Sequence, residues 1–578
     1  MNLIDALECL KAPVAENAHP LRVFLACGFT PLHLETFLTA DLRNLYPACR
    51  VQLNSGLFGD LAGNLERLHP EDHDTLVVLI EWPDLDSRLG LRTLGGWQVE
   101  KLPDIVNSVY HSLERLTRAL QRISSALPTC ICLPTLPLPP LFYTGTQQSS
   151  VLELTLRRNI ASFAEALSVN RQISVVSSQY IDENSPLGNR FDLRAEITQG
   201  FPYKILHASV IGELLAEIIR RPEPKKGLIT DLDDTLWAGI LGEVGVEGIH
   251  WHLDQHAQLH GIYQQFLASL ASAGILVAAA SKNEAILVEH AFERDDLLLS
   301  KTSVFPIEAH WRRKSESVQH ILKRWNVLAD SVVFVDDSPM EVAEVQGAFP
   351  EMECLVFPKG DYPAFWRMLS HLRNRFAKTA ISEEDSLRLQ SIRNSGTSPE
   401  PAEGDSLDDF LQQADGRLTF VLGKPIEDPR AFELLNKTNQ FNLNGKRYDE
   451  MAWSKFLKDT QTCLVTVSYQ DKFGKLGKIA VLIGRREARK FVVESWVMSC
   501  RAFSRRIEFH CLQYLFEKFA DDEIEFELQA TNRNGPVMEF LQQVVDRPMK
   551  GNPQLSRSSF LKKAPKMPHY VEEVSVVG

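Results

Sequence analysis

Residues 228–237 read Leu228-Ile229-Thr230-Asp231-Leu232-Asp233-Asp234-Thr235-Leu236-Trp237, and this stretch decides the fold of the central part of the chain. A short apolar run leads directly into an acidic cluster, which predicts a buried strand with carboxylates at its carboxyl end. Carboxylates packed so closely repel one another unless a cation neutralises them, and Mg²⁺ prefers such hard oxygen ligands beside a substrate phosphate. One aspartate can then attack phosphorus, while a second donates a proton to the leaving oxygen.

Three further signals follow along the chain. An apolar run, 275–280, ends at the hydroxyl of Ser281, Lys314 precedes a predicted helix, and another apolar run, 331–335, ends in Asp336 and Asp337. A hydroxyl donor, a cation for the phosphoryl oxygens and a second acidic pair for Mg²⁺ complete the groups that phosphoryl transfer needs. One Asp-rich strand end alone is usually a solvated loop. The signals in this order instead favour an enzyme site.

The residues around these signals resemble the haloacid-dehalogenase-like phosphatases, and in particular their FkbH-like branch. The motifs that carry the resemblance lie between about residues 225 and 545 and read Asp231-Leu232-Asp233-Asp234-Thr235-Leu236-Trp237-Ala238-Gly239-Ile240-Leu241-Gly242-Glu243, Ser281-Lys282-Asn283, Lys314-Ser315-Glu316, Asp336-Asp337-Ser338-Pro339 and Lys437-Thr438-Asn439-Gln440-Phe441-Asn442. The resemblance implies roles for individual residues. These are Asp231 as nucleophile, Asp233 as acid/base, Ser281 and Lys314 as phosphate anchors, and Asp231, Asp233, Asp336 and Asp337 around the metal.

The choice of inner-sphere metal ligand between Asp336 and Asp337 stays open. We prefer Asp337, because one acid of the pair can instead orient Lys314.

The substrate class is implied by the resemblance alone. Proteins of this kind dephosphorylate an activated phosphoglycerate (1,3-bisphosphoglycerate). They then load its glyceryl group onto the phosphopantetheine arm of an acyl carrier protein in polyketide-type biosynthesis. We therefore expect a Mg²⁺-dependent phosphatase and glyceryl transferase whose partners are a phosphorylated three-carbon acid and a carrier protein. Two alternatives remain: a plain phosphatase acting on a small metabolite or a phosphoprotein, and a non-catalytic scaffold that binds carrier proteins.

Length and composition predict a three-domain α/β protein. The 578 residues correspond to about three or four domains at ~150 residues each. The resemblance implies which domains these are. Residues 1–220 resemble an SGNH-hydrolase-like α/β domain, and residues 221–380 a Rossmann-like phosphatase domain. After an expected helix and flexible linker over 381–405, residues 406–578 resemble an acetyltransferase-like α+β domain. The phosphatase domain should lack a large cap, because 239–249 is Gly-rich and 256–273 is needed as the crossover helix. Its open mouth suits a substrate carried on a protein.

The first domain is predicted to be a docking or scaffold domain. It has no Gly-Asp-Ser nucleophile motif after its first strand, where Cys27 follows the run 21–26. Cys27 is a poor candidate nucleophile, because the sequence names no His and Asp partner for it.

The third domain carries a candidate catalytic thiol. Cys500 follows a predicted strand, 491–498, and Arg501 is predicted to open a helix. A helix N-terminus flanked by Arg501, Arg505 and Arg506 favours an anion, either a thiolate or a phosphate. Cys500 is therefore a candidate carrier of the glyceryl group as a thioester. The alternative is a buried cysteine that only packs.

Two other groups of metal-ligand residue types have simpler explanations. Cys130 and Cys132 have no second Cys or His pair nearby in sequence, so a buried strand is preferred over a zinc site. His252, His256 and His260 would share one face of a helix, but one helix seldom supplies three ligands. Polar packing beside the active site is the preferred interpretation.

Charge, hydropathy and cysteine usage exclude several classes of protein. Lys and Arg total 62 against 75 Asp and Glu, a net charge of −13, so we expect no nucleic-acid partner. No apolar run reaches the ~18–20 residues of a membrane helix, so no membrane partner is expected. The 9 cysteines are scattered and no secretory h-region precedes them. Reduced thiols and a cytoplasmic location are the expectation.

Overall fold

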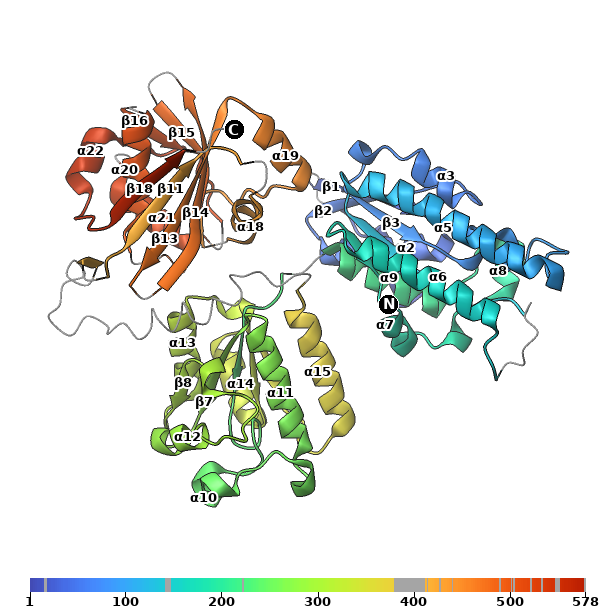
Figure 1. Ribbon diagram of the computed structural model, residues 1–578, viewed down its shortest axis with the longest axis horizontal. Helices are drawn as coiled ribbons and strands as arrows, with labels where there is room; N and C mark the ends of the chain where they lie inside the picture. The colour runs from blue at the N-terminus through green and yellow to red at the C-terminus, as the bar shows by residue number, and fades with distance from the viewer. Residues whose placement is uncertain are drawn as a thin grey trace. The chain divides into compact units, whose positions relative to one another are not determined.

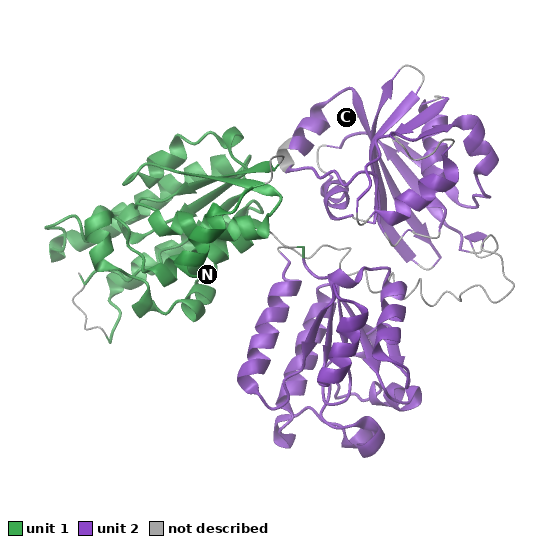
Figure 2. Ribbon diagram, turned by 180° about the vertical axis from the view of Figure 1, so that it is seen from behind, with its two compact units in different colours: residues 1–223 green, residues 224–578 purple. Residues whose placement is uncertain are grey.

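The computed structural model describes residues 1–578 except for 15–17, 141–146, 221–222, 379–410, 413, 426–427, 439, 473, 488–489, 500–501, 503–504, 520–521, 532–533, 546–550 and 576–578. The chain divides into two compact units, Met1–Glu223 and Pro224–Gly578 (Figure 2). Their boundary lies within the charged, Pro-interrupted segment 220–226. The second unit holds two separate sheets, and a third domain beginning near residue 406 stays a prediction.

Unit 1 is built on a five-stranded parallel sheet in the order β2-β1-β3-β4-β5 (Figure 1). Its strands are β1 (His19–Ala26), β2 (Cys49–Ser55), β3 (Thr75–Leu79), β4 (Thr129–Cys132) and β5 (Ile173–Val175). Its helices are α1 (Leu3–Lys11), α2 (Leu32–Leu45), α3 (Leu61–Glu66), α4 (Trp82–Leu85), α5 (Leu102–Ser124), α6 (Val151–Ser168), α7 (Ser178–Asn184), α8 (Leu193–Gln199) and α9 (Ile205–Arg220).

Helices cover both faces of this sheet, which explains why β3 is apolar at almost every position. Leu76 and Val78 of β3 belong to a core that includes residues of α5 and α6. Val77 and Leu79 point to the other side, into a core shared with α2 and α9. Alternate side chains of one strand thus enter two different cores, as the two-residue period of a strand requires.

The first sheet of unit 2 is also parallel, in the order β10-β9-β6-β7-β8. Its strands are β6 (Gly227–Thr230), β7 (Leu276–Ser281), β8 (Ile307–Ala309), β9 (Val332–Asp336) and β10 (Glu353–Val356). Its helices are α10 (Leu241–Val244), α11 (Gln258–Ser272), α12 (Ala285–Ala291), α13 (Lys314–Trp325), α14 (Pro339–Ala348) and α15 (Tyr362–Phe376). Leu228 packs into a core with α11 and α15, and the next residue, Ile229, into a core with α13 and α14. The prediction of a crossover helix over 256–273 is confirmed by α11.

The second sheet of unit 2 has eight strands and is mostly antiparallel. Its strands are β11 (Arg417–Leu422), β12 (Phe441–Asn442), β13 (Thr462–Asp471), β14 (Gly474–Glu487), β15 (Lys490–Met498), β16 (Glu523–Phe526), β17 (Gln554–Ser556) and β18 (Tyr570–Ser575). Helices α20 (Ile507–Phe519), α21 (Gly535–Val544) and α22 (Arg557–Lys563) pack on one face, and α18 (Pro429–Lys437) and α19 (Glu450–Lys458) on the other. The predicted strands 463–467, 479–483 and 491–498 correspond to β13, β14 and β15.

In each parallel sheet, the direction in which successive strands are added reverses once. The chain runs from β1 to β2 on one side and then places β3 on the other side of β1. In unit 2 it runs from β6 through β7 to β8 and then places β9 on the other side of β6. Open α/β sheets bind ligands at such points, outside the carboxyl ends of the strands. No helix among the described residues is both long enough and apolar enough to cross a membrane.

Candidate active site

The residues predicted to act in phosphoryl transfer, Asp231, Asp233, Ser281, Lys314, Asp336 and Asp337, lie at the carboxyl edge of the first sheet of unit 2. β6 ends directly before Asp231, β9 ends at Asp336, and β7 ends at Ser281. These strands are neighbours in the order β9-β6-β7. The residues that follow them therefore lie together, at the point where the sheet changes direction.

A buried ion cluster forms the centre of this edge. Lys314, the first residue of α13, donates hydrogen bonds to Asp231 Oδ1 and, at 2.8 Å, to Asp336 Oδ2. The side chains of Lys314, Asp231 and Asp336 are only 4%, 8% and 1% exposed. Two buried carboxylates thus share one ammonium group, which leaves negative charge for a further cation to neutralise.

Burial controls the proton affinity of this cluster. It raises the pKa of Asp231 to about 7, and the charge of Lys314 offsets this only in part. Burial also raises the pKa of Asp336. For Lys314, burial acts to lower the pKa, but the two carboxylates outweigh it and the pKa is raised. A bound divalent cation would favour the ionised aspartates and reverse their shifts.

Asp337 lies beside the cluster and completes a set of carboxylates that could hold a metal ion. Asp231, Asp336 and Asp337 each offer an oxygen, and these atoms lie within 4.8 Å of one another. The Asp337 backbone N–H donates to Thr235 Oγ1 at 3.1 Å. Lys359 Nζ lies 2.5 Å from Asp337 Oδ2. Asp336 bonds Lys314, whereas Asp337 faces Lys359, so the two neighbouring acids have different cationic partners.

Asp233 stands outside this carboxylate set and is held by three N–H groups. Its Oδ1 accepts from Trp237 Nε1 at 3.0 Å and from the backbone of Leu241 at 3.2 Å. Its Oδ2 accepts from Asn283 Nδ2 at 2.9 Å. The same amide donates to the buried Ser281 Oγ, also at 2.9 Å. Asn283 therefore fixes the orientation of the predicted acid/base and of the predicted phosphate anchor together.

Two residues of this site were not assigned roles from the sequence. Asn283 lies in the quoted segment 281–283, but only its contacts with Asp233 and Ser281 show what it does. Lys359 follows β10 and donates to Asp234 Oδ2 at 2.8 Å as well as facing Asp337. A lysine just after the fifth parallel strand is the signal that could have indicated it, because this strand ends at the same edge of the sheet.

The three histidines do not share a helical face. His252 precedes a short 3₁₀ turn, His256 has a φ of 56°, and α11 begins only at Gln258. His260 Nδ1 lies 2.9 Å from the carbonyl oxygen of Thr235, which requires a proton on that nitrogen. This contact places His260 beside the loop that follows Asp231, as polar packing.

Cys500 and Cys27 were the two cysteines considered as nucleophiles, and the structure describes only Cys27. Cys500 and Arg501 lie outside the described residues, so the role of Cys500 stays a prediction. The predicted helix start at Arg501 also lies outside the described residues, and the described helix α20 begins at Ile507. In unit 1, the Cys27 thiol donates to the Phe29 carbonyl at 3.2 Å, and burial raises its pKa to about 12. Such a thiol stays protonated, which argues against Cys27 as a nucleophile.

Two arginines before α20 bond to other parts of the protein, and the two cysteines of β4 are buried. Arg506 Nη1 donates to the backbone oxygen of Lys566 at 2.8 Å, and Arg505 Nε lies 3.7 Å from Asp471 Oδ2. Cys130 and Cys132 are buried within β4, as preferred over a zinc site.

Comparison with known proteins shows a likeness of fold. The crystal structure of the N-terminal part of the protein BF1531 from Bacteroides fragilis contains a phosphatase domain complexed with Mg. It aligns with a TM-score of 0.51 and 18% identity, covering 66% of this chain and 100% of that chain. A protein from Streptococcus pneumonia described as a candidate platelet activating factor aligns over 38% of this chain and 90% of its own, with 13% identity. Its TM-score is 0.22, and it carries no argument. No protein-family profile and no curated protein matches the sequence.

Proposed function

We propose that this chain is a Mg²⁺-dependent phosphatase with Asp231 as its nucleophile. The observation that carries the proposal is the buried cluster in which Lys314 joins Asp231 to Asp336 at the sheet edge. The fold likeness to a structure that contains a phosphatase domain complexed with Mg supports it. Asp231, Asp336 and Asp337 fit Mg²⁺, because they offer closely spaced carboxylate oxygens around uncompensated buried charge.

The residues of the site divide the reaction between them. Asp231 forms a bond to phosphorus as the bond from phosphorus to the leaving oxygen breaks, and Asp233 gives that oxygen its proton. Asp233 then takes a proton from the water that attacks the phosphorylated Asp231, which frees inorganic phosphate and restores the carboxylate. Lys314 and Ser281 hold phosphoryl oxygens. Mg²⁺, when bound, supplies positive charge to these oxygens in the transition state.

We further propose that the chain is FkbH-like and transfers a glyceryl group. In this proposal 1,3-bisphosphoglycerate loses its ester phosphate at Asp231. The Cys500 thiolate then attacks the acyl carbon, a C–S bond forms, the C–O bond to the acyl phosphate breaks, and phosphate leaves. The pantetheine thiol of an acyl carrier protein replaces Cys500 in a final thioester exchange. Residues 406–578 would then act as an acetyltransferase-like domain and 1–220 as an SGNH-like docking domain.

Mass analysis of a carrier protein separates this proposal from its alternatives. The carrier is incubated with the full chain, Mg²⁺ and 1,3-bisphosphoglycerate, and its intact mass and the released phosphate are measured. A glyceryl adduct supports the transferase. Phosphate release without an adduct supports the plain phosphatase. The fold likeness taken alone favours neither the transferase nor the plain phosphatase. If neither the adduct nor free phosphate forms, the non-catalytic scaffold is the interpretation that remains.

Removal of one carboxylate should weaken metal binding. Mg²⁺ at 100 times its dissociation constant should stabilise the wild type by about 2.7 kcal/mol. Asp337→Asn should lower Mg²⁺ affinity at least about tenfold, since loss of even an outer partner of a metal site typically costs about 10- to 100-fold. Calorimetric titration with Mg²⁺ measures the dissociation constant of the wild type and of the variant. The exposed Asp254→Asn is the matched control, and equal affinities in all three proteins would remove Asp337 from the site.

Replacement of Cys500 should separate the two proposed activities. Cys500→Ala should release ester phosphate at the wild-type rate, because Asp231 performs that step without a thiol. It should lose glyceryl loading of the carrier, because no thioester can form on the enzyme. Peptide mapping of the wild type, quenched before carrier is added, should find the acyl group on the peptide that contains Cys500. Full carrier loading by Cys500→Ala would leave this cysteine as a packing residue.

A further inference from the structure

Unit 1 contains a cavity that the proposed phosphatase chemistry does not use. The cavity has a volume of about 390 Å³ and lies at the carboxyl edge of the parallel sheet. Its walls include Gly28 after β1, Phe58 after β2, Asp84 after β3 and Leu136 after β4. This is the point where the strand order β2-β1-β3 changes direction, the usual place for a ligand in such a sheet. Small-molecule sites typically have volumes of about 300–1,000 Å³.

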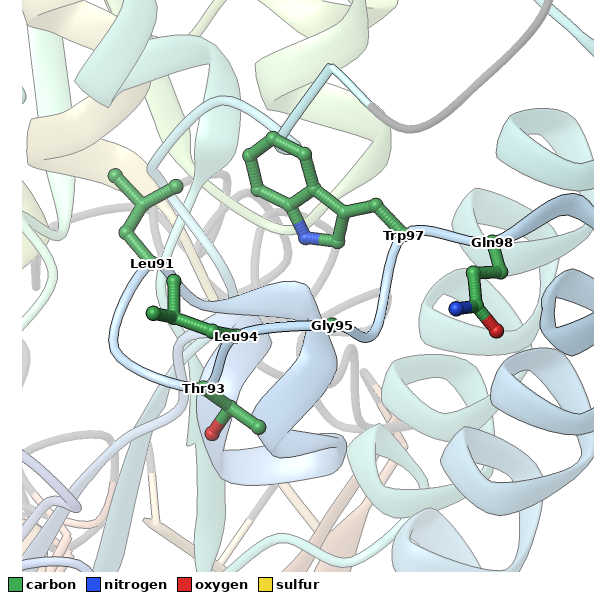
Figure 3. Close-up of a pocket in the computed structure, with 6 residues that line it drawn as sticks. All are labelled: Leu91, Thr93, Leu94, Gly95, Trp97 and Gln98. Atoms are coloured by element: carbon green, nitrogen blue, oxygen red, sulfur yellow. The ribbon is translucent and has the colours of Figure 1, made fainter.

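The cavity walls are mainly apolar. Aromatic, aliphatic and proline side chains line them, namely Phe29, Phe58, Leu61, Trp82, Leu89 and Leu138 among others. The loop that forms one wall also lines a second hollow of about 290 Å³, whose residues are drawn in Figure 3. Leu91 and Thr93 line both the cavity and this hollow. Leu94 and Trp97 on this loop are 90% and 41% exposed. An apolar ligand could therefore extend from the cavity along the loop and cover these side chains.

Two of the charged groups at the cavity cancel each other. Arg92 Nε donates to Glu196 Oε1 at 3.0 Å, and its guanidinium lies 5.4 Å from the centre of the Phe58 ring. Glu81 is also satisfied, because its carboxylate accepts hydrogen bonds from Thr135, Leu136 and Tyr203. Neither the arginine nor Glu81 is thus available as the main anchor for a ligand.

Asp84 is the remaining charged group at the cavity wall. Its Oδ2 accepts from the backbone N–H of Glu81 at 2.7 Å, and among the described residues no hydrogen bond reaches its Oδ1. This oxygen packs against Gly28, where an added Cβ would come within 1.7 Å of it. Burial raises the pKa of Asp84 to about 7. A cation next to the carboxylate would offset the cost of burying its charge.

We propose that this cavity binds an amphipathic small molecule, with its apolar body against the Trp82 wall and an amine head at Asp84 Oδ1. The Arg92–Glu196 pair adds no net charge, so the ionisable groups that remain at the cavity, Glu81 and Asp84, are both acidic. An ammonium head favours the ionised form of Asp84 and pairs with it, whereas a fatty carboxylate head finds no such partner. Cys27 does not line the cavity, and its thiol donates to the Phe29 carbonyl, so we propose a binding role for this cavity.

A pair of ten-carbon probes with opposite head charges tests the proposal. Calorimetric titration of the full chain with n-decylamine and with decanoate, both below their micelle concentrations, compares the heads directly. We expect one decylamine per chain and at least about tenfold weaker binding of decanoate. A change in tryptophan fluorescence should accompany binding, because Trp82 and Trp97 line the two hollows. Equal affinity for both probes, or non-saturable binding of several amines, would overturn the proposal.

A matched pair of variants identifies the anchor. Asp84→Asn keeps the shape of the side chain and an acceptor for Glu81, and should weaken decylamine binding at least about tenfold. The exposed Glu165→Gln on α6 makes the same change in net charge and should leave binding unchanged. Thr93→Trp, at the exposed wall that both hollows share, should block decylamine while leaving the sheet untouched. Wild-type decylamine affinity in folded Asp84→Asn and Thr93→Trp would show that the amine binds elsewhere.

Discussion

Asp231→Asn is expected to reduce phosphate release by at least about 10³-fold, because it removes the oxygen that attacks phosphorus. The amide keeps the shape of the side chain, and Lys314 keeps its hydrogen bond to Asp336 at 2.8 Å. The variant should therefore fold. Release of inorganic phosphate from a chromogenic phosphate monoester at saturating Mg²⁺ measures the loss, and circular dichroism verifies the fold.

Asp234→Asn is the matched control for this experiment. Asp234 lies in the same acidic segment but contacts Lys359 and the backbone of Gly239 rather than the buried cluster. It should keep most of the phosphatase activity. Undiminished phosphate release by folded Asp231→Asn would contradict the assignment of the nucleophile.

Lys314→Met is expected to destabilise the metal-free protein by about 3–5 kcal/mol, because it leaves two buried carboxylates without their ammonium partner. Added Mg²⁺ should restore part of this loss, since the divalent cation neutralises the same carboxylates. Hydrogen exchange of the β6 and β9 amides in EDTA, and then in Mg²⁺, measures the free energy of opening at this part of the sheet.

Lys359→Met provides the contrast. The Lys359 side chain is 46% exposed, so its ion pairs with Asp234 and Asp337 are screened by solvent. Its loss should cost at most about 1 kcal/mol. Equal destabilisation by the two variants would mean that the ammonium of Lys314 does not hold the buried cluster together.

The sequence predicted the α/β class of the first two sheets because their central strands are continuous apolar runs. Residues 75–80 and 275–280 could be recognised in this way, since helices bury both faces of β3 and β7. The short strands of the last sheet were not predicted. β12 and β17 have two and three residues, too few to show an alternating pattern. They form because neighbouring strands offer them hydrogen-bonding edges, which sequence periodicity does not record.

Those residues of the candidate site that lie at the end of a buried strand could be predicted from the sequence, because an acidic or hydroxyl residue after an apolar run is visible there. Asp231, Ser281 and Asp336 belong to this group, because each directly follows or ends a buried strand. Partners that depend on side-chain direction were not predictable. Asn283 turns back to Asp233, and Lys359 joins the site from the fifth strand, and neither contact follows from spacing along the chain.

At one edge of the eight-stranded sheet, its first and last strands in sequence lie side by side. β11 and β18 are parallel neighbours, with Arg417 opposite Tyr570 and Leu422 opposite Ser575. The hairpin-like pairs β13–β14 and β14–β15 join residues that are close in sequence, so they can form early and lose little chain entropy. Joining β18 to β11 requires a far larger loop to close. β11 also pairs with β13, which lies nearer to it in sequence, so the β18 edge strand depends most on the long loop. Amides of β18, and the β11 amides that bond to it, should therefore gain protection last during refolding, which makes addition of this edge strand the slow step of sheet formation.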